Sequence, residues 1–435
     1  MTKFVVMLTQ AVLLFYGTQL LPLTGRLDES RFLCYGLISL AGLFELHKGE
    51  LRKLRVIDLI AFGILTFAFF SYSYSLYPKW TLLRSTGNLV MYVAIFWALW
   101  SSCHKLGDVY KLINALIFVW FVYYLINVIF LYFRPQDSFI VMTENDYVAQ
   151  AYRRFSGVSS NPNGIGNFSA IILPLVFWNF QRKRNLLNLF LLIAVSFSLV
   201  YSFSRNAFVC GVIGVAVYLY LSVQRHGAFF FLCAVFLIVF AITYIDLFGM
   251  FLPTALVRAE SVSILGGRLE GWQAALDLIK AHPWRGYGFG IEDFLFDYFG
   301  YDFQTHAGAY VHNSFLGLAV QLGWIVPSVF YSSLVLFLVR SFSKIMGLDN
   351  GLRLFAIALY SSLISGLVNS VFETWIYSAG GIFAFPFFTF LMILMWILDY
   401  KKKAVGIPAV RSEPNEPNLT NQKLALARTF QSSEM

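Results

Sequence analysis

Charged residues are scarce in this chain. Asp, Glu, Lys and Arg make up 13% of its 435 residues, whereas hydrophobic residues make up 58%. A typical soluble domain carries about twice that share of charge. The apolar residues fall into blocks of about 16 to 24, the length that crosses a bilayer core as a helix. The composition therefore predicts an all-α polytopic membrane protein.

About twelve transmembrane helices are expected from these blocks. The ranges are 4–24, 32–46, 56–74, 88–103, 111–133, 165–180, 186–203, 206–222, 228–250, 313–339, 354–371 and 378–398. The first range does not resemble a cleaved signal peptide, because it lacks an A-x-A-type site and is long enough to span a membrane.

The ranges divide the chain into four parts. Residues 1–133 form an N-terminal group of transmembrane helices. Residues 134–340 form a core whose outward loops include a long one at 251–312, and residues 341–403 form a C-terminal group. The tail at 404–435 has few large apolar residues and contains EPNEPN, so we expect it to be disordered.

Basic residues indicate the orientation of the helices. They concentrate in the connections HKGELRKLR and QRKR and in the cluster from Lys401 to Lys403. By the positive-inside rule these segments are cytoplasmic, and so are both termini. The net charge of +9 follows mainly from this topology. Because the charges are scattered over short loops and form no stripe, nucleic-acid binding is a poor explanation of them.

Residues suited to metal binding are also few. The four cysteines lie in or at the ends of apolar runs without paired spacing, which disfavours disulfides and a cysteine-based metal site. No outward-facing D-x-D or E-x-D pair occurs, and the acidic residues Glu292, Asp293 and Asp297 have no histidine at ligand-like spacing. We therefore expect no metal and no cofactor.

Three outward-facing pieces carry polar residues outside the long loop. The first, 134–164, contains YRRFSGVSSNPNGIG, and its Asn, Pro, Gly and Ser content predicts turns. The second is FSRN, where Arg205 lies between two apolar runs of a tight hairpin. Arg205 either extends to the membrane interface or meets an anionic ligand. The third is NSVFETWIYS, with Glu373 and Trp375.

The long loop contains an amphipathic helix. GGRLEGWQAALDLIKAHP places Arg268 and Trp272 on one face, with Arg268 in the first turn. The free N–H groups of a helix start favour anions, so Arg268 suits an anionic ligand. The alternative is an ion pair with Glu270, Asp277 or another nearby carboxylate. The following HPWRGYGFG lacks the Lys-Ser/Thr of a P-loop and predicts a tight loop with close backbone approach.

His312 ends the long loop, in VHNSFLGLAVQLGW. A histidine just before a helix is often only a polar cap. A neutral imidazole is also a good proton acceptor near neutral pH, and Arg154, Arg205 and Arg268 lie on the same side of the membrane in the expected topology. One base beside several guanidiniums suits the deprotonation of a hydroxyl next to a bound pyrophosphate.

These motifs resemble those of a known family. SRNA, GRLEGWQAAL, AHPWRGYGFG and HNSFLGLAVQLGW are similar to motifs of the O-antigen ligase and polymerase superfamily, membrane glycosyltransferases that take a glycan from undecaprenyl pyrophosphate. RFSGVSSNPNGIG resembles a further pattern of that family, and the likeness covers about residues 150–330. It implies a GT-C-like fold with a long periplasmic loop.

The resemblance also implies roles for single residues. His312 would act on the acceptor hydroxyl, and Arg205, Arg268 and, less specifically, Arg154 would hold the lipid-linked pyrophosphate without a metal. Three neighbours of the motifs would support them, namely Asn313, Trp272 and Arg285.

The implied protein is an O-antigen ligase of a bacterial inner membrane with a periplasmic active site. Its acceptor would be a sugar hydroxyl of lipid A-core, attacked with inversion at the anomeric carbon. A polysaccharide polymerase, which uses a second lipid-linked glycan as acceptor, is the closest alternative. A protein O-oligosaccharyltransferase is a further one. A transporter or flippase predicts internal repeats and charges in mid-span, and neither is evident.

Overall fold

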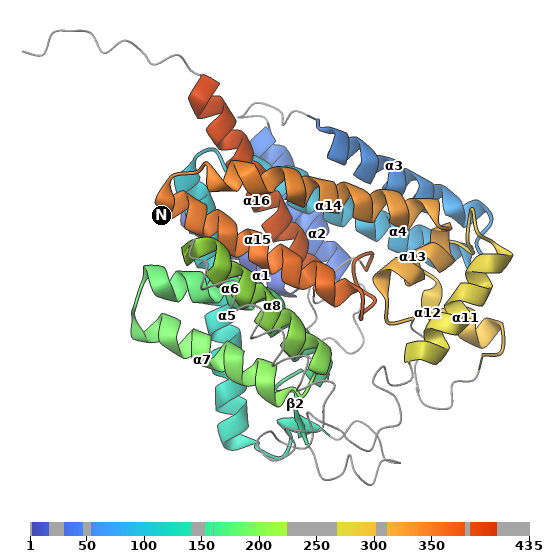
Figure 1. Cartoon of the computed structure of the whole chain (residues 1–435), viewed down its shortest axis with the longest axis horizontal. Coiled ribbons are helices and arrows are strands. Elements are labelled where there is room, and N and C mark those ends of the chain that lie inside the picture. The colour runs from blue at the N-terminus through green and yellow to red at the C-terminus, as the bar shows by residue number, and fades with distance from the viewer. Residues whose placement is uncertain are drawn as a thin grey trace, which may run out of the picture. The chain divides into compact units, whose positions relative to one another are not determined.

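The described part of the protein is almost entirely helical (Figure 1). The computed structural model describes residues 2–16, 30–46, 54–140, 153–159, 161–223, 268–301, 311–378 and 383–406. The ninth expected helix, 228–250, lies outside them. So do residues 251–267 of the long loop and all but the first three residues of the expected tail.

The secondary-structure elements follow one another along the chain with short connections. They are α1 (Thr2–Tyr16), α2 (Ser30–Leu46), α3 (Val56–Phe70), the 3-10 turn η2 (Ser71–Ser73), α4 (Pro78–Val93), the π-helical turn η3 (Ala94–Leu99), α5 (Leu106–Phe133), β1 (Phe139–Ile140), β2 (Arg154–Phe155), α6 (Pro162–Arg182), α7 (Leu186–Tyr201), α8 (Arg205–Val223), α11 (Arg268–Ala281), α12 (Glu292–Tyr298), α13 (Ser314–Leu322), α14 (Ile325–Met346), α15 (Asn350–Ser370) and α16 (Ala384–Gly406). β1 and β2 pair antiparallel.

Six of the described helices are long and apolar enough to cross a membrane. They are Val56–Ser73, Pro78–Leu99, Leu106–Phe133, Arg205–Val223, Ile325–Met346 and Asn350–Ser370, and shorter apolar helices occur at Val6–Tyr16, Leu186–Tyr201 and Ala384–Tyr400. The chain is thus a helical protein with several candidate membrane spans. The number twelve stays a prediction.

Two of the expected boundaries differ from the structure. The range 313–339 was expected as one helix, and it is two, α13 and α14, separated at Gly323 and Trp324. α6 begins at Pro162, inside the expected loop, because the Asn161 side chain accepts a hydrogen bond from Asn163 N and proline suits the first position of a helix.

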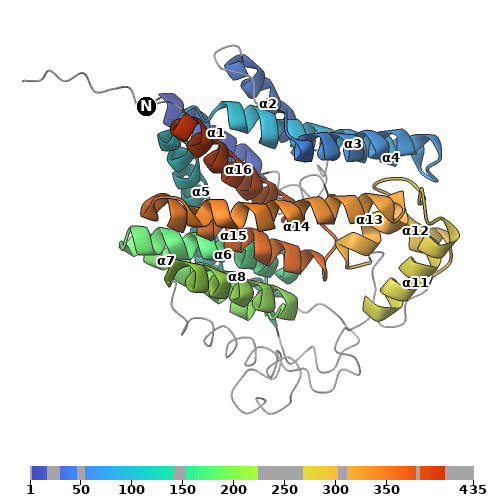
Figure 2. The same cartoon turned by 45° about the horizontal axis from the view of Figure 1, so that its top comes forward.

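α6, α8 and α15 pack closely against one another (Figures 1 and 2). Small residues allow this approach, as is common between helices in membranes. A Cβ at Gly214 would lie 3.0 Å from both Pro174 of α6 and Ser365 of α15. The Ser365 hydroxyl donates to the carbonyl of Cys210 at 2.9 Å, which ties α15 to α8.

α11, α12 and α13 share a second, smaller apolar cluster, to which Ala275, Leu295 and Val320 belong. Ala275 and Ile279 are buried on α11, as expected for the amphipathic helix. The segment between α11 and α12 docks on the end of α13, where the amide of Tyr287 donates to the carbonyl of Val320 at 3.1 Å. This docking holds the second half of the long loop against the helix that follows His312.

The segment between α11 and α12 turns at three glycines. Gly286, Gly288 and Gly290 all have positive φ, at 62°, 113° and 74°. A Cβ at Gly286 would lie 2.4 Å from the carbonyl group of Gln321. The expectation of a tight loop with close backbone approach is confirmed.

Contacts divide the chain into two units, residues 1–398 and 399–435. All the elements described here lie in the first unit, apart from the last residues of α16.

Gly323→Ala is expected to destabilise the protein. Gly323 has φ 77°, and a Cβ there would lie 2.4 Å from the carbonyl group of Trp284, so the backbone must move. We expect a loss of roughly 2 kcal/mol or more. Gly351→Ala is the control, because a Cβ on this helical glycine meets nothing within 4 Å. Thermal unfolding in detergent measures both, and equal melting temperatures for the two variants would contradict the prediction.

Candidate functional site

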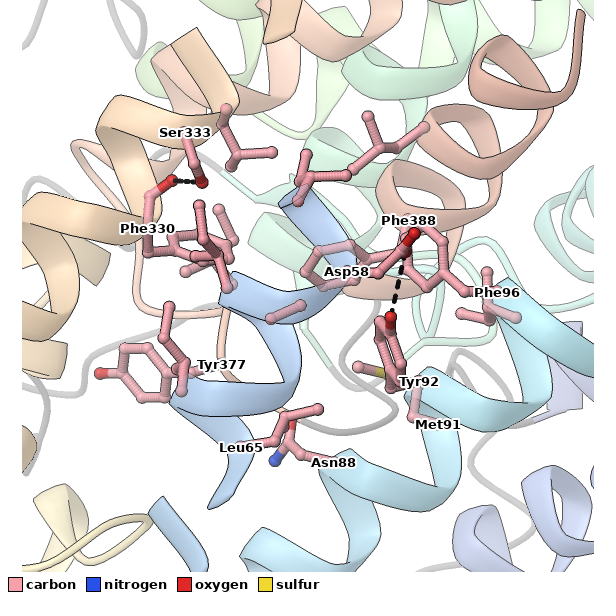
Figure 3. Close-up of a pocket in the computed structure, with 18 of the residues that line it drawn as sticks. Asp58, Leu65, Asn88, Met91, Tyr92, Phe96, Phe330, Ser333, Tyr377 and Phe388 are labelled. Carbon is pink, nitrogen blue, oxygen red and sulfur yellow. Dashed lines mark hydrogen bonds between the residues drawn. The ribbon is translucent and has the colours of Figure 1, made fainter. Parts of the chain in front are cut away.

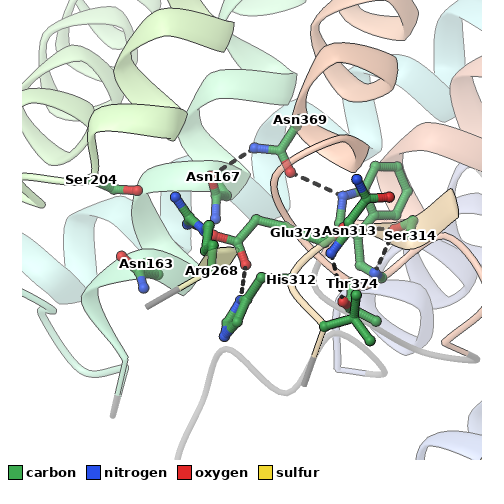
Figure 4. A network of polar contacts seen from close by, with 12 residues as sticks. Asn163, Asn167, Ser204, Arg268, His312, Asn313, Ser314, Asn369, Glu373 and Thr374 are labelled. Carbon is green, nitrogen blue, oxygen red and sulfur yellow. Dashed lines mark hydrogen bonds and ion pairs between the residues drawn. The ribbon is translucent and has the colours of Figure 1, made fainter. Parts of the chain in front are cut away.

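The carboxylate of Glu373 lies between Arg268 and His312 (Figure 4). Its Oε1 accepts a hydrogen bond from Nη2 of Arg268 at 3.0 Å, and its Oε2 lies 3.2 Å from Nδ1 of His312. The three side chains are 11%, 27% and 21% exposed, respectively. They come from the loop after α15, the first residue of α11 and the residue two before α13. One half-buried carboxylate thus joins the sequence-predicted base to a sequence-predicted arginine.

Two loops carry His312 and Glu373, and hydrogen bonds join them. The Ser314 hydroxyl donates to the carbonyl of Glu373 at 2.6 Å and accepts from the amide of Trp375 at 3.0 Å. The amide of Asn313 donates to Oγ1 of Thr374 at 3.1 Å. The backbone around the base and the backbone around the carboxylate are therefore held as one piece.

His312 has a left-handed backbone, with φ 50°. Such a conformation is uncommon for a residue with a side chain and often marks a functional site. The cap of α13 is Asn313, whose Oδ1 accepts from the amides of Phe315 and Leu316 at 2.9 and 3.0 Å. The alternative interpretation of His312 as the helix cap is therefore wrong, because its neighbour has that role.

Arg268 is the first residue of α11, as expected. Of its two sequence-based interpretations, the ion pair is present, and the partner is Glu373, far along the chain. Asp277, considered as a partner, instead pairs with Lys280 at 3.0 Å. The bond to Glu373 uses Nη2, and a guanidinium has five N–H donors, so the pair does not exhaust its capacity to bind an anion.

Arg154 and Arg205 lie around the short turn between α7 and α8. Nε of Arg154 donates to the carbonyl of Ser202 at 2.8 Å, and its Nη2 binds Asn163 at the start of α6. Arg205 is the half-buried first residue of α8. Phe203, within the turn, has φ 47° and is the second non-glycine residue with positive φ among those described.

A chain of amides connects α6 with the Glu373 loop. Nδ2 of Asn369 donates to Oδ1 of Asn167 at 2.8 Å, and Nε1 of Trp375 donates to Oδ1 of Asn369 at 2.9 Å. Asn163, which binds Arg154, lies one turn before Asn167 on α6. Figure 4 draws Asn163, Asn167 and Asn369 together with the Glu373 group. Outward pieces that are far apart in the sequence therefore meet through hydrogen bonds.

The two remaining sequence-predicted residues differ in position. Trp272 follows Arg268 by one turn on α11 and is half-buried against the smaller apolar cluster. Arg285 is exposed, and its guanidinium lies over the ring of Tyr74, 5.5 Å from the ring centre. The structure thus brings Arg285 to the turn after η2.

The acidic residues of α12 have hydrogen-bond donors as partners. Asp293 accepts two hydrogen bonds from Arg84, at 2.6 and 2.8 Å. Glu292 is 3% exposed and accepts from Val311 N at 2.7 Å and from the hydroxyl of Tyr377. Burial raises the pKa of Glu292 to about 7, although the hydrogen bonds from Tyr377 and Val311 lower it. Independence from metals stays a prediction.

An apolar cavity of about 110 Å³ lies between α3, α4 and α14 (Figure 3). Its lining includes Ile64, Phe330 and Tyr377. Tyr377 also binds Glu292 and follows Glu373 by four residues, so one side of the cavity adjoins the loop of the site. Asp58, buried and bound by the hydroxyl of Tyr92 at 3.1 Å, is a polar group of the same lining.

Sequence reasoning placed Glu373 in an outward piece but gave it no role. The available signal was a carboxylate directly after an apolar run, on the same side of the membrane as His312 and the arginines. A single acidic residue in a short loop does not indicate its partner, which lies 105 residues away. Glu373 is the site residue that the sequence analysis missed.

A family model described as O-antigen ligase matches residues 187–331. This stretch includes Arg205, Arg268 and His312, and it ends before Glu373. The resemblance to the O-antigen ligase and polymerase superfamily is therefore confirmed over residues 187–331. Ligase and polymerase are not distinguished by this match.

None of the curated proteins matches the chain. One similar solved structure is described as "Structural coordination of polymerization and crosslinking by a peptidoglycan synthase complex". It is 14% identical over 79% of this chain and 96% of its own, with a TM-score of 0.46. A likeness of this degree carries no argument about the fold or the activity of this chain.

Asn313→Ala is expected to destabilise the protein by about 1 kcal/mol, because two amides of α13 lose their acceptor. Asn313→Asp keeps an oxygen at that position and should be close to wild type. The melting temperature in detergent measures both. If alanine and aspartate variants unfold at the same temperature, Asn313 does not cap α13 in solution.

Proposed function

Because residues 187–331 belong to the O-antigen ligase and polymerase superfamily, we propose that this membrane protein is an O-antigen ligase. It transfers a glycan from undecaprenyl pyrophosphate to a sugar hydroxyl of lipid A-core, on the periplasmic side of a bacterial inner membrane. The reaction inverts the anomeric carbon and needs no metal. The contact between His312 and Glu373 is the observation that carries the proposal.

His312 is the base. Nδ1 of its ring faces Oε2 of Glu373, and the other ring nitrogen points away from that carboxylate (Figure 4). In the tautomer with the proton on Nδ1, the ring donates to Glu373, and Nε2 takes the proton of the acceptor hydroxyl. The carboxylate then stabilises the imidazolium that forms, as an orienting acid does in other base-catalysed sites.

The reaction forms one bond and breaks another. The acceptor oxygen bonds to the anomeric carbon of the donor sugar while its proton passes to His312. The bond from that carbon to the pyrophosphate oxygen breaks, and the electron pair leaves with undecaprenyl pyrophosphate. The growing negative charge needs fixed positive groups, and a good contact of this kind lowers the barrier by about 3 kcal/mol.

The arginines suit that task. Arg268 lies at the start of α11, where the helix N–H groups add to its charge. Its bond to Glu373 sets the guanidinium within the same group as the base. Arg205 and Arg154, around the α7–α8 turn, are the further candidates for the pyrophosphate. The expected outward topology places all three on the side of His312.

The cavity beside Tyr377 supports a lipid-linked donor. It lies between helices that are candidate membrane spans, and its lining is mostly apolar (Figure 3). A polyprenyl chain in the bilayer has the chemistry to fill it, because both surfaces are hydrocarbon. Since Tyr377 belongs to the Glu373 loop, a chain in this cavity would lead its pyrophosphate toward the site.

A polysaccharide polymerase is the second candidate, because the family match is common to both activities. Deletion of the gene, followed by electrophoresis of the lipopolysaccharide, separates them. A ligase predicts loss of all bands above the core while undecaprenyl-linked polymer accumulates. Core carrying a single repeat would instead identify a polymerase. An unchanged banding pattern would contradict both.

His312→Ala is expected to lower transfer by at least about 100-fold, the range for loss of a general base. Glu373→Gln should lower it roughly 10- to 100-fold, because an amide does not stabilise the imidazolium. Turnover by purified protein with lipid-linked donor and acceptor measures both. The matched control is His282→Ala, a histidine of the same loop that packs against Tyr287. Activity of His312→Ala within a few-fold of wild type, at normal abundance, would remove the base assignment.

Arg268→Lys and Arg205→Lys should rescue only part of the activity lost in the alanine variants. Lysine keeps the positive charge, but it lacks the planar fork that binds two oxygens at once. We expect roughly a tenfold loss in kcat/KM for each lysine variant. Fully active lysine variants at both positions would show that these residues serve topology or ion pairing alone.

A further inference from the structure

Glu292 is a buried carboxyl group that the mechanism above does not use. Three donors surround it: the amide of Val311 at 2.7 Å, the hydroxyl of Tyr377, and Nε2 of Gln321 at 3.4 Å. Its exposed fraction is 3%. A carboxyl group is costly to bury, and each of its oxygens here receives at least one hydrogen bond.

The donors come from the segments that hold the site. Val311 precedes His312 directly, and Tyr377 follows Glu373 by four residues. Gln321 belongs to α13, which begins after His312, and its Oε1 accepts from the amide of Gly290. Glu292 therefore joins the backbone of the base to the loop of the carboxylate that orients it.

Gly317 leaves the space that this pair of side chains occupies. A Cβ on Gly317 would lie 2.0 Å from the hydroxyl of Tyr377 and 2.8 Å from Oε2 of Glu292. Gly317 is helical, within α13, so its backbone does not itself require glycine. The missing side chain thus has a local reason, which is the contact between Glu292 and Tyr377.

We propose that Glu292 is a positioning residue, which keeps the His312 loop and the Glu373 loop in the register that catalysis needs and does not touch the substrate. The inference rests on the proposed function. It assigns the carboxyl of α12 to the base on α13's side and to the Glu373 loop, rather than to a metal ion.

The charge state of Glu292 affects this support. Its ionised form accepts from all three donors, whereas its protonated form must place an O–H toward one of them. Desolvation raises the pKa of Glu292 to about 7, and the groups that act on it are Tyr377, Val311, His312 and Asp293. Asp293 is itself paired with Arg84. The supporting form therefore prevails only above neutral pH.

The raised pKa has the opposite effect on stability. A carboxyl whose pKa is higher in the folded state than its ordinary 4.5 stabilises the fold below 4.5, and this contribution is lost as pH rises through about 7. Glu292→Gln has no proton to lose, so it escapes that loss. At pH 8 the variant should be slower than wild type and at least as resistant to unfolding, a combination that general damage to the fold does not give.

The experiment compares wild type, Glu292→Gln and Asp297→Asn as full-length protein in detergent. Asp297→Asn is the matched control, because it removes an exposed carboxylate from the same helix. The measurements are kcat and the donor KM at pH 6 and pH 8, together with melting temperatures. For Glu292→Gln we expect kcat about tenfold below wild type at pH 8 and within about threefold at pH 6, with the donor KM changed less than about twofold.

A second pair of variants tests the same contact without altering a carboxyl group. Tyr377→Phe removes one donor to Glu292, and Gly317→Ala pushes on both side chains. Both should lower kcat with little change in donor KM, and the substitution of Tyr377 should have the smaller effect.

Two results would overturn the inference. One is a kcat for Glu292→Gln equal to wild type at both pH values, and the other is an equal loss at both pH values with a lower melting temperature, which indicates a structural role alone. Failure of wild type itself to transfer the glycan would instead sink the proposed function. In that case the pH dependence of the melting temperatures still tests whether Glu292 titrates in the folded protein.

Discussion

The carboxylate of Glu373 is the contact on which the arrangement of the site depends. It receives Arg268 from 105 residues before it and His312 from 61 residues before it. Hydrogen bonds between charged groups are stronger than neutral ones, and partial burial strengthens them further. This one group therefore fixes the start of α11 and the ring of His312 relative to the loop after α15.

Much of the polar chemistry around that contact satisfies backbone groups where helices end. An unpaired amide or carbonyl near the bilayer is costly, so loops at that depth need internal partners. Ser314 bonds three backbone groups of the Glu373 loop, namely the carbonyl of Glu373 and the amides of Trp375 and Ile376. Asn313 bonds two amides of α13. The His-Asn-Ser sequence thus combines a reactive side chain with the two residues that hold its backbone.

The helices behind the site give these loops a rigid base. α6, α8 and α15 approach closely through small residues such as Gly214 and Ser365. The amides of Asn167 and Asn369 bond to each other within this group and reach Trp375 beside Glu373. On the other side, α13 is held by the glycine turns between α11 and α12. The site therefore lies between two packed groups of helices.

The sequence by itself determined the helices, the amphipathic face of α11 and the types of residue at the site, because these depend on composition and on local periodicity. It also indicated His312 and the arginines through short motifs. Only the tertiary structure decided that Arg268 pairs with Glu373, since a local pattern does not show which distant carboxylate a guanidinium meets. The same reason explains the break at Gly323, where apolar residues continue on both sides and only the docking of Pro283 and Trp284 ends α13. Partners distant in the chain are chosen by packing, and packing is not written in any single segment.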